Sequence, residues 1–234
     1  MIIAFEGIDG AGKNTLVTAL EAELLARELP VARVSFPRYE DSVHAQLAQR
    51  ALTGQMGDLI DSIHGMATLF ALDRAEVAEQ LEDLDADGYI VLMDRFVASN
   101  AAYSAARLAG EVAEGEEPVE PVEPAERPVV EWVRSLEIDD LGSPVPDLQV
   151  LVDASAEVAG ERAKSREQQD AARTRDAYES DGGLQQRTLE AYRSLASAEW
   201  LGPWQVVASE AGGVAERASQ LADRIEAGYR ELDS

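Results

Sequence analysis

A lysine follows three closely spaced glycines near the start of the chain. Residues 7–13 read GIDGAGK, which has the pattern G-x-x-x-x-G-K, and they stand between the apolar run IIAF and an amphipathic segment over 14–28. Gly10 and Gly12 allow the backbone to curl so that its N–H groups point inward, and the following helix adds the positive end of its dipole. The pattern predicts a loop that binds a polyphosphate. The alternative is a glycine-rich turn between a strand and a helix.

Charged and polar side chains of this loop refine the prediction. The sequence has 20 lysines and arginines, of which two are lysines, and Lys13 is one of them. The use of lysine at this position indicates a place where a compact ammonium fits and a planar guanidinium does not. Asp9 would repel phosphates unless it holds Mg²⁺ or accepts a hydrogen bond from a sugar hydroxyl; the alternative is an N-cap or turn aspartate. Asn14 stands where a hydroxyl residue normally contacts the metal. Its amide oxygen could serve more weakly, or the metal is held elsewhere.

The segment FPRY, residues 36–39, ends one apolar run. Phe36 could face an aromatic base, Pro37 would stiffen the turn, and Arg38 or Tyr39 could meet a phosphate. An ordinary turn with a packed aromatic residue is the alternative.

The segment DRF, residues 94–96, ends another apolar run. Arg95 can form a forked contact with a phosphate while Asp94 orients it or the metal shell. A surface ion pair between these two residues explains the dipeptide equally well.

A candidate for base recognition lies in the helical pattern over 57–81. Phe70 and Arg74 are four residues apart and therefore share a helix face. An aromatic ring and a guanidinium side by side suit a nucleobase, whereas the alternative places Phe70 in the core and Arg74 at a solvated edge. Asn100 and Tyr103 fall early in the helical pattern that follows DRF.

Arginines crowd into residues 161–179 although the chain is poor in positive charge. A closing segment that delivers arginines can neutralise a phosphoryl group during transfer. A solvated helix with interspersed ion pairs is a serious alternative. The arginines are Arg162, Arg166, Arg173 and Arg175.

Elements that would position these residues follow from the apolar runs. Residues 2–5, 31–36, 89–94, 148–153 and 204–207 read as buried strands with amphipathic segments between them. Alternation of this kind predicts an α/β fold with helices on both faces of a five-stranded parallel sheet, a three-layer sandwich like that of P-loop NTPases. Ligands of such sheets bind where the strands end.

Composition limits the classes of function. The net charge of −25 argues against a nucleic-acid partner, the chain has no cysteine for disulfides or thiolate metal sites, and no run is long enough to span a membrane. We expect a cytoplasmic protein with a single domain over 1–234. The proline- and glutamate-rich residues 110–128 predict an extended surface insertion, and neither His44 nor His64 indicates a metal site.

Together these segments resemble the thymidylate kinase family, and closely its actinobacterial members. The resemblance covers nearly the whole chain, through FEGIDGAGK, FPRY, MATLFALDRA, DRFVASNAAYSAARL and SREQQDAARTRDAYE. The insertion and Asn14 depart from the family pattern. The resemblance implies an ATP- and Mg²⁺-dependent kinase that converts dTMP to dTDP, and a homodimer. A kinase for another pyrimidine nucleoside or monophosphate, or an impaired nucleotide-binding homologue, are the alternatives.

The resemblance also implies roles for individual residues. ATP phosphates would be held by Gly7, Gly10, Ala11, Gly12, Lys13, Asn14, Thr15 and Leu16. The acceptor dTMP would be held by Asp9, Phe36, Pro37, Tyr39, Phe70, Arg74, Arg95, Asn100, Tyr103, Asp176 and Tyr178, and the metal by Asp9 and Glu179. Catalytic roles would fall to Lys13, Asp9, Arg95, Arg162, Arg166 and Arg173.

One division within the family concerns the source of the catalytic arginine. Members with glycine after the loop aspartate, as at Gly10 here, supply arginine from a lid, which would span 162–178. The resemblance therefore predicts that replacing Arg166 by alanine lowers turnover far more than affinity for dTMP.

Overall fold

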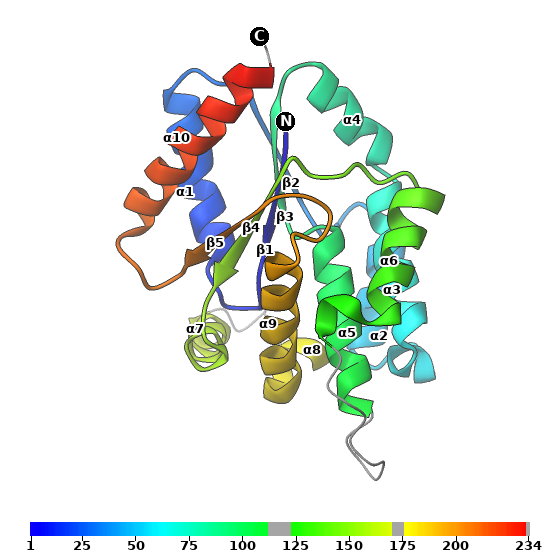
Figure 1. Cartoon of the computed structure of the whole chain (residues 1–234). Coiled ribbons are helices and arrows are strands. Elements are labelled where there is room, and N and C mark those ends of the chain that lie inside the picture. Colours follow the sequence, from blue (N-terminus) through cyan, green and yellow to red (C-terminus); the bar gives the residue numbers. More distant parts are fainter. Residues whose placement is uncertain (112–122, 170–175, 233–234) are drawn as a thin grey trace.

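Five parallel strands form one sheet in the computed structural model, which describes residues 1–111, 123–169 and 176–232 (Figure 1). Their spatial order is β2-β3-β1-β4-β5. This confirms the predicted α/β class and each strand read from the apolar runs. The strands are β1 (Ile2–Glu6), β2 (Val31–Ser35), β3 (Ile90–Asp94), β4 (Leu148–Asp153) and β5 (Trp204–Ala208).

Helices cover both faces of the sheet and complete three layers. On one face α1 (Lys13–Ala26) packs against α10 (Val214–Leu232), and on the other α5 (Val97–Glu111) packs against α9 (Gly182–Ser197) (Figure 1). Within the described ranges, no helix has the length and apolar character needed to cross a membrane. The other helices are α2 (Val43–Leu52), α3 (Ile63–Ala75), α4 (Ala78–Ala86), α6 (Pro128–Arg134), α7 (Ala156–Gln169) and α8 (Ala177–Ser180).

The sheet is apolar because helices cover both of its faces. All residues of β1 are buried, and Phe5, Leu92 and Val150 have no exposed surface. β1 lies in the middle of the sheet and pairs with both β3 and β4, so the carboxyl ends of three strands meet at one edge. The loops after these strands are therefore the expected place for a ligand.

The prediction for residues 110–128 is wrong at both ends. Helix α5 continues to Glu111, a 3-10 turn covers Pro124–Glu126, and α6 begins at Pro128. Proline suits the first turn of a helix because its missing N–H would have no intrahelical partner there, and α6 buries an apolar face. Residues 112–122 of the predicted insertion lie outside the described residues.

Candidate active site

The loop between β1 and α1 has a backbone conformation that favours glycine. Gly7, Gly10 and Gly12 have φ angles of 144°, 85° and 101°. Gly10 also lies against α7, where a Cβ would stand 2.0 Å from the carbonyl oxygen of Ala159. Helix α1 begins at Lys13, directly after this turn. The curled loop and the helix N-terminus predicted from the glycine pattern are therefore both present.

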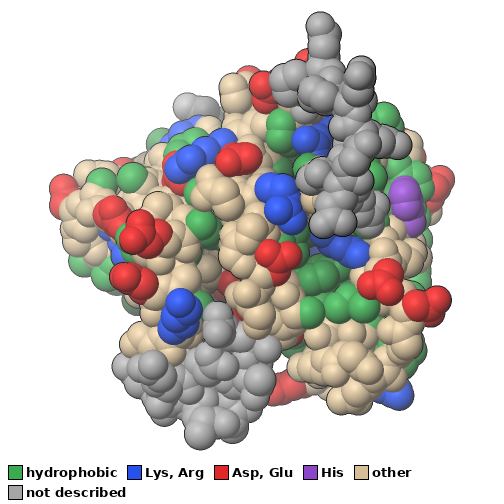
Figure 2. All heavy atoms as spheres, turned by 90° about the horizontal axis from the view of Figure 1, so that it is seen from below, with side chains coloured by type: hydrophobic (Ala, Val, Ile, Leu, Met, Phe, Trp, Pro, Cys, Tyr) green, Lys and Arg blue, Asp and Glu red, His purple; other side chains and the backbone are tan. Residues whose placement is uncertain are grey.

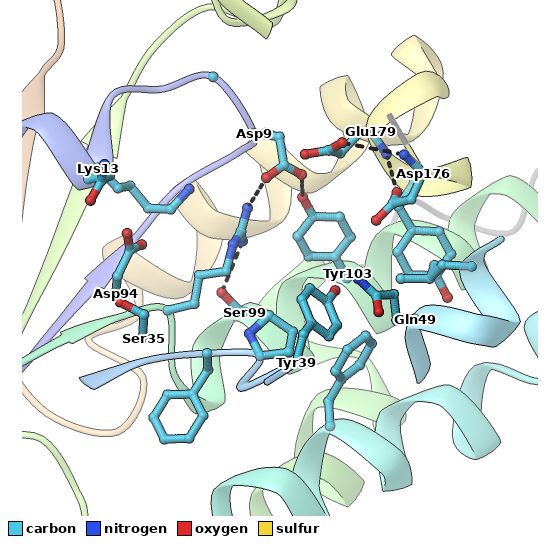
Figure 3. Close-up of a pocket in the computed structure, with 18 of the residues that line it drawn as sticks. Asp9, Lys13, Ser35, Tyr39, Gln49, Asp94, Ser99, Tyr103, Asp176 and Glu179 are labelled. Atoms are coloured by element: carbon cyan, nitrogen blue, oxygen red, sulfur yellow. Dashed lines mark hydrogen bonds and ion pairs between the residues drawn. The ribbon is translucent and has the colours of Figure 1, made fainter. Parts of the chain in front are cut away.

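The Lys13 ammonium lies across this loop (Figure 3). The side chain is buried, and Nζ donates hydrogen bonds to the carbonyl oxygens of Gly7 at 2.9 Å and Ile8 at 3.0 Å. Burial, together with the nearby charge of Arg95, lowers the pKa of Lys13 to about 8. Because its partners are neutral carbonyls, the ammonium can exchange them for phosphate oxygens, which form stronger charge-assisted hydrogen bonds.

Asp9 connects the loop to residues that follow β3. Its Oδ1 accepts a hydrogen bond from Arg95 Nη2 at 2.6 Å, and its Oδ2 accepts one from the Tyr103 hydroxyl at 2.7 Å (Figure 3). Burial alone would raise the pKa of Asp9, but the charges of Arg95 and Lys13 outweigh it and hold this pKa well below its ordinary value. Asp9 is thus ionised at neutral pH. Of the alternative, the N-cap role is wrong, since Gly12 is the N-cap of α1, whereas Asp9 does lie in a turn.

Arg95 is held inside the site. It has a left-handed backbone with φ of 67°, and its guanidinium lies 5.4 Å from the centre of the Tyr103 ring. Burial alone would lower the pKa of Arg95, but Asp9 outweighs it and raises this pKa, so the side chain stays a cation. The alternative of a surface ion pair with Asp94 is wrong, because the partner is Asp9.

Arg74 and Asn100 meet on a buried carboxylate that the sequence analysis did not single out. Arg74 Nη2 and Asn100 Nδ2 each donate to Glu137 Oε1 at 2.7 Å, and Arg74 Nε donates to Oε2. Asn100 Nδ2 also donates to the carbonyl oxygen of Ala67 at 2.9 Å. Arg74 is only 3% exposed, so the alternative of a solvated edge is wrong.

Aromatic side chains lie beside this pair. Phe36 is buried against Phe96 with ring centroids 5.8 Å apart, and the Phe36–Pro37 peptide bond is cis. Tyr39, two residues on, has a raised pKa because of burial and the charge of Asp176. Phe70 is half-buried on α3 and also lines the cavity.

The far end of the predicted lid packs over the site. The rings of Tyr103 and Tyr178 stack at 5.9 Å with an angle of 14° between their planes. Asp176 and Glu179 form a capping box at the start of α8, and burial raises the pKa of Asp176. Gln185 on α9 accepts a hydrogen bond from the Asp9 N–H at 3.2 Å and donates to the Tyr178 carbonyl oxygen at 2.9 Å.

The arginine segment reaches the loop through Arg162. This residue lies on α7, and its Nη1 donates to the carbonyl oxygen of Ala11 at 3.4 Å and to Ser209 Oγ at 3.3 Å. Arg166 belongs to the same helix, but its side chain lies outside the described residues, as does all of Arg173. Their predicted roles therefore stay predictions.

One cavity of about 900 Å³ brings most of the predicted site residues together. Figure 2 views the face at the carboxyl ends of the strands, where basic side chains lie among acidic ones. Gly7 and Ala11 on the loop and Leu16 on α1 are also predicted to bind ATP, but they do not line the cavity. The predicted residues that line it are Asp9, Gly10, Gly12, Lys13, Asn14, Thr15, Phe36, Pro37, Tyr39, Phe70, Arg74, Arg95, Asn100, Tyr103, Arg162, Asp176, Tyr178 and Glu179.

The donors in the cavity fit Mg²⁺ bound together with a nucleotide. Asp9, Asp94, Asp176 and Glu179 line the cavity, yet no three carboxylates or histidines of the described residues lie close enough together to enclose an ion. Mg²⁺ usually keeps several waters and takes one or two carboxylates plus substrate phosphates. Asn14 Oδ1 accepts a hydrogen bond from Arg33, which favours the alternative that the metal is held elsewhere.

Five buried polar residues in the described part of the site escaped the sequence analysis: Glu6, Ser99, Gln185, Tyr192 and Glu137. Glu6 ends an apolar strand, but the carboxylates that end β3 and β4 are only partly buried, so this position alone does not reveal it. Ser99 stands one helical turn after Arg95, a spacing that brings the two close together. Gln185, Tyr192 and Glu137 come from segments remote from their partners, so no local spacing reveals them.

Comparison with known proteins decides the family. The family model described as thymidylate kinase matches residues 5–116. A thymidylate kinase of Mycobacterium tuberculosis (strain CDC 1551 / Oshkosh) is 48% identical over 210 residues, which cover 90% of this chain and 92% of that protein. The chain belongs to the thymidylate kinase family. It is therefore a phosphotransferase, as the sequence resemblance predicts.

Other relatives are more distant but carry the same name. A thymidylate kinase of Bifidobacterium longum (strain DJO10A) is 31% identical over 85% of each chain. One of Akkermansia muciniphila is 33% identical over 78% of this chain and 73% of that protein. The similarity to the mycobacterial thymidylate kinase agrees with the predicted closeness to actinobacterial members.

Proposed function

We propose that this chain transfers the terminal phosphoryl group of ATP to the phosphate of dTMP and releases dTDP, a step toward dTTP. The observation that carries this proposal is that the glycine loop with Lys13 and the buried Arg74 and Asn100 line the same cavity. Transfer is direct and in line, with no covalent enzyme intermediate, because this chemistry needs mainly positioning and neutralisation of charge.

The donor phosphates lie on the loop in this proposal. The first N–H groups of α1 have no intrahelical partners and point toward the turn, and Lys13 supplies the positive charge. Asn14 and Thr15 lie in the first turn of this helix. Arg162, with the predicted partners Arg166 and Arg173, adds positive charge to the transferred group from the side of α7.

The geometry around Asn100 favours thymine over cytosine. Both amide hydrogens of Asn100 are used by Ala67 and Glu137, so its Oδ1 is left as an acceptor. An acceptor suits the N3–H of thymine and opposes the N3 lone pair of cytosine. Arg74 donates to a base carbonyl with the hydrogens of Nη1, while Phe70 stacks on the ring.

The sugar and phosphate of dTMP lie between these two ends. Arg95 and Tyr39 bind the acceptor phosphate, and Asp9 lies beside the sugar. Tyr103, half-buried and bonded to Asp9, occupies the space that a 2′-hydroxyl would need. Phe36 and Pro37 line the methyl side of the base. Tyr178 on α8 and Asp176, the residue before α8, close over dTMP.

Mg²⁺ would be held by Asp9 and Glu179 together with water and phosphate oxygens. Its chemistry there would be to offset the negative charge of the phosphate groups during transfer. We also infer a homodimer from family membership, and a cytoplasmic location because both nucleotides are available there.

A turnover assay with the purified chain, ATP and Mg²⁺ tests this function. We expect ADP release to be fastest with dTMP, slower with dUMP and dCMP, and at background with thymidine, which lacks the acceptor phosphate. The variant Lys13→Met serves as a control and should lose turnover with every acceptor. A different preferred acceptor, or binding of both nucleotides without turnover, would overturn the proposal.

A further inference from the structure

A buried network of hydrogen bonds lies behind Arg95, on the side away from Asp9. Arg95 Nη1 donates to Ser99 Oγ and to the Tyr192 hydroxyl, both at 3.2 Å. These two hydroxyls lie 2.7 Å from each other. Glu6, at the end of β1 and without exposed surface, accepts from Ser99 Oγ at 2.6 Å and from the Tyr192 hydroxyl at 3.2 Å.

The network has a fixed direction. The single hydrogen of Ser99 goes to Glu6 Oε2, and the hydrogen of Tyr192 goes to Ser99 Oγ at 2.7 Å or to Glu6 Oε2 at 3.2 Å. Both hydroxyls therefore offer lone pairs to Arg95. Glu6 Oε1 meanwhile accepts the backbone N–H of Phe96 at 2.9 Å, which fixes the turn that holds Arg95 in its left-handed conformation. One buried carboxylate thus restrains both the backbone and the guanidinium of Arg95.

The hydrogen bonds of Arg95 leave one edge of its guanidinium for a ligand. Nη1 uses both of its hydrogens on Ser99 and Tyr192, and Nη2 uses one on Asp9. Among the described residues, no acceptor takes the Nε hydrogen or the second hydrogen of Nη2. These two N–H groups form the parallel fork that binds a phosphate in a bidentate manner, and Arg95 lines the cavity.

We propose that Glu6 and Tyr192 are positioning residues that orient Arg95 so that its Nε–Nη2 edge binds the phosphate of the acceptor nucleotide. This rests on the proposed function, in which Arg95 binds that phosphate. Neither Glu6 nor Tyr192 lines the cavity, so both act through Arg95.

Calorimetric binding of dTMP and of thymidine to the full chain separates this role from a structural one, because only dTMP carries the phosphate. We expect Tyr192→Phe to weaken dTMP binding about tenfold, the worth of a hydrogen bond to a charged group, and to leave thymidine binding unchanged. Tyr229→Phe is the matched control, since Tyr229 bonds only to the Gly88 carbonyl oxygen among the described residues, and should change neither affinity.

A second variant set checks that the effect passes through Arg95. Glu6→Gln should also weaken binding of dTMP selectively, because glutamine keeps the shape but replaces one of the two acceptor oxygens by an NH2 group, which donates. In an Arg95→Met background, Tyr192→Phe should cause no further loss of dTMP affinity. Equal losses for dTMP and thymidine, no loss for either, or full additivity with Arg95→Met would overturn the positioning role. Wild-type protein that fails to bind dTMP would instead overturn the proposed function.

Discussion

Glu137 is the residue on which the base-binding end of the site depends. It has no exposed surface and accepts hydrogen bonds from both Arg74 and Asn100. Removing one partner of a buried ion pair costs about 3–5 kcal/mol, because the remaining charge is left uncompensated. We therefore expect Glu137→Gln to lower the free energy of unfolding by about 3 kcal/mol and to weaken dTMP binding, as measured by urea unfolding and calorimetry.

The double variant Arg74→Met with Glu137→Met is the control for this prediction. Replacing both charges by apolar groups removes the uncompensated charge, so stability should return toward that of the wild type while dTMP binding stays weak. A single variant Glu137→Gln that is as stable as the wild type would contradict the buried pairing.

Lys13 carries a prediction about pH. Burial and Arg95 lower its pKa to about 8, so below this pH the side chain is an ammonium and above it a neutral amine. Because kcat/KM reports the free enzyme, kcat/KM for ATP should fall as the pH rises through about 8. In Lys13→Arg, which stays charged, this fall should be absent at a lower overall activity. A wild-type enzyme whose kcat/KM shows no such fall would refute the role of the Lys13 ammonium in ATP binding.

At the scale of elements, the contact between the glycine loop and α7 predicts an unequal response to alanine. Gly10 and Gly142 both have positive φ, 85° and 70°, but a Cβ at Gly10 would meet Ala159 while one at Gly142 meets nothing within 4 Å. Gly142→Ala should cost about 1–2 kcal/mol of stability from backbone strain alone. Gly10→Ala should cost more and also weaken ATP binding at least tenfold, measured by thermal unfolding and calorimetry. Equal effects would argue against the close contact.

The sequence predicts the elements of this site better than their side-chain partners. The strands and the glycine loop follow from local signals, because apolar runs and glycine spacing are set by the backbone positions themselves. Glu137 lies in a π-helical segment, Ser135–Asp140, for which no residue pattern exists. Its partner Arg74 is 63 residues away, so only the folded chain shows that the two charges meet.

At the scale of the whole molecule, the net charge of −25 predicts a response to salt. Like charges on a compact surface repel one another, and salt screens this repulsion over the Debye length, about 10 Å at 0.1 M. We expect the melting temperature to rise between low salt and about 0.3 M NaCl, by differential scanning fluorimetry. Choline chloride should raise the melting temperature by the same amount, because the effect comes from screening of the surface charges. Sodium phosphate would confound the measurement because it can bind the loop. A melting temperature that falls with NaCl would contradict the prediction.

The side-chain amide of Gln185 holds the backbones of Asp9 and Tyr178 in a fixed arrangement. It accepts from the backbone of Asp9 and donates to the backbone of Tyr178, partners of opposite polarity, so a half-turn of the amide would break both contacts. Helix α9 therefore cross-links the glycine loop to α8, two segments that lie far apart in the sequence. An uncharged cross-link of this kind keeps its geometry at every pH and offers no charge to compete with the phosphates beside it.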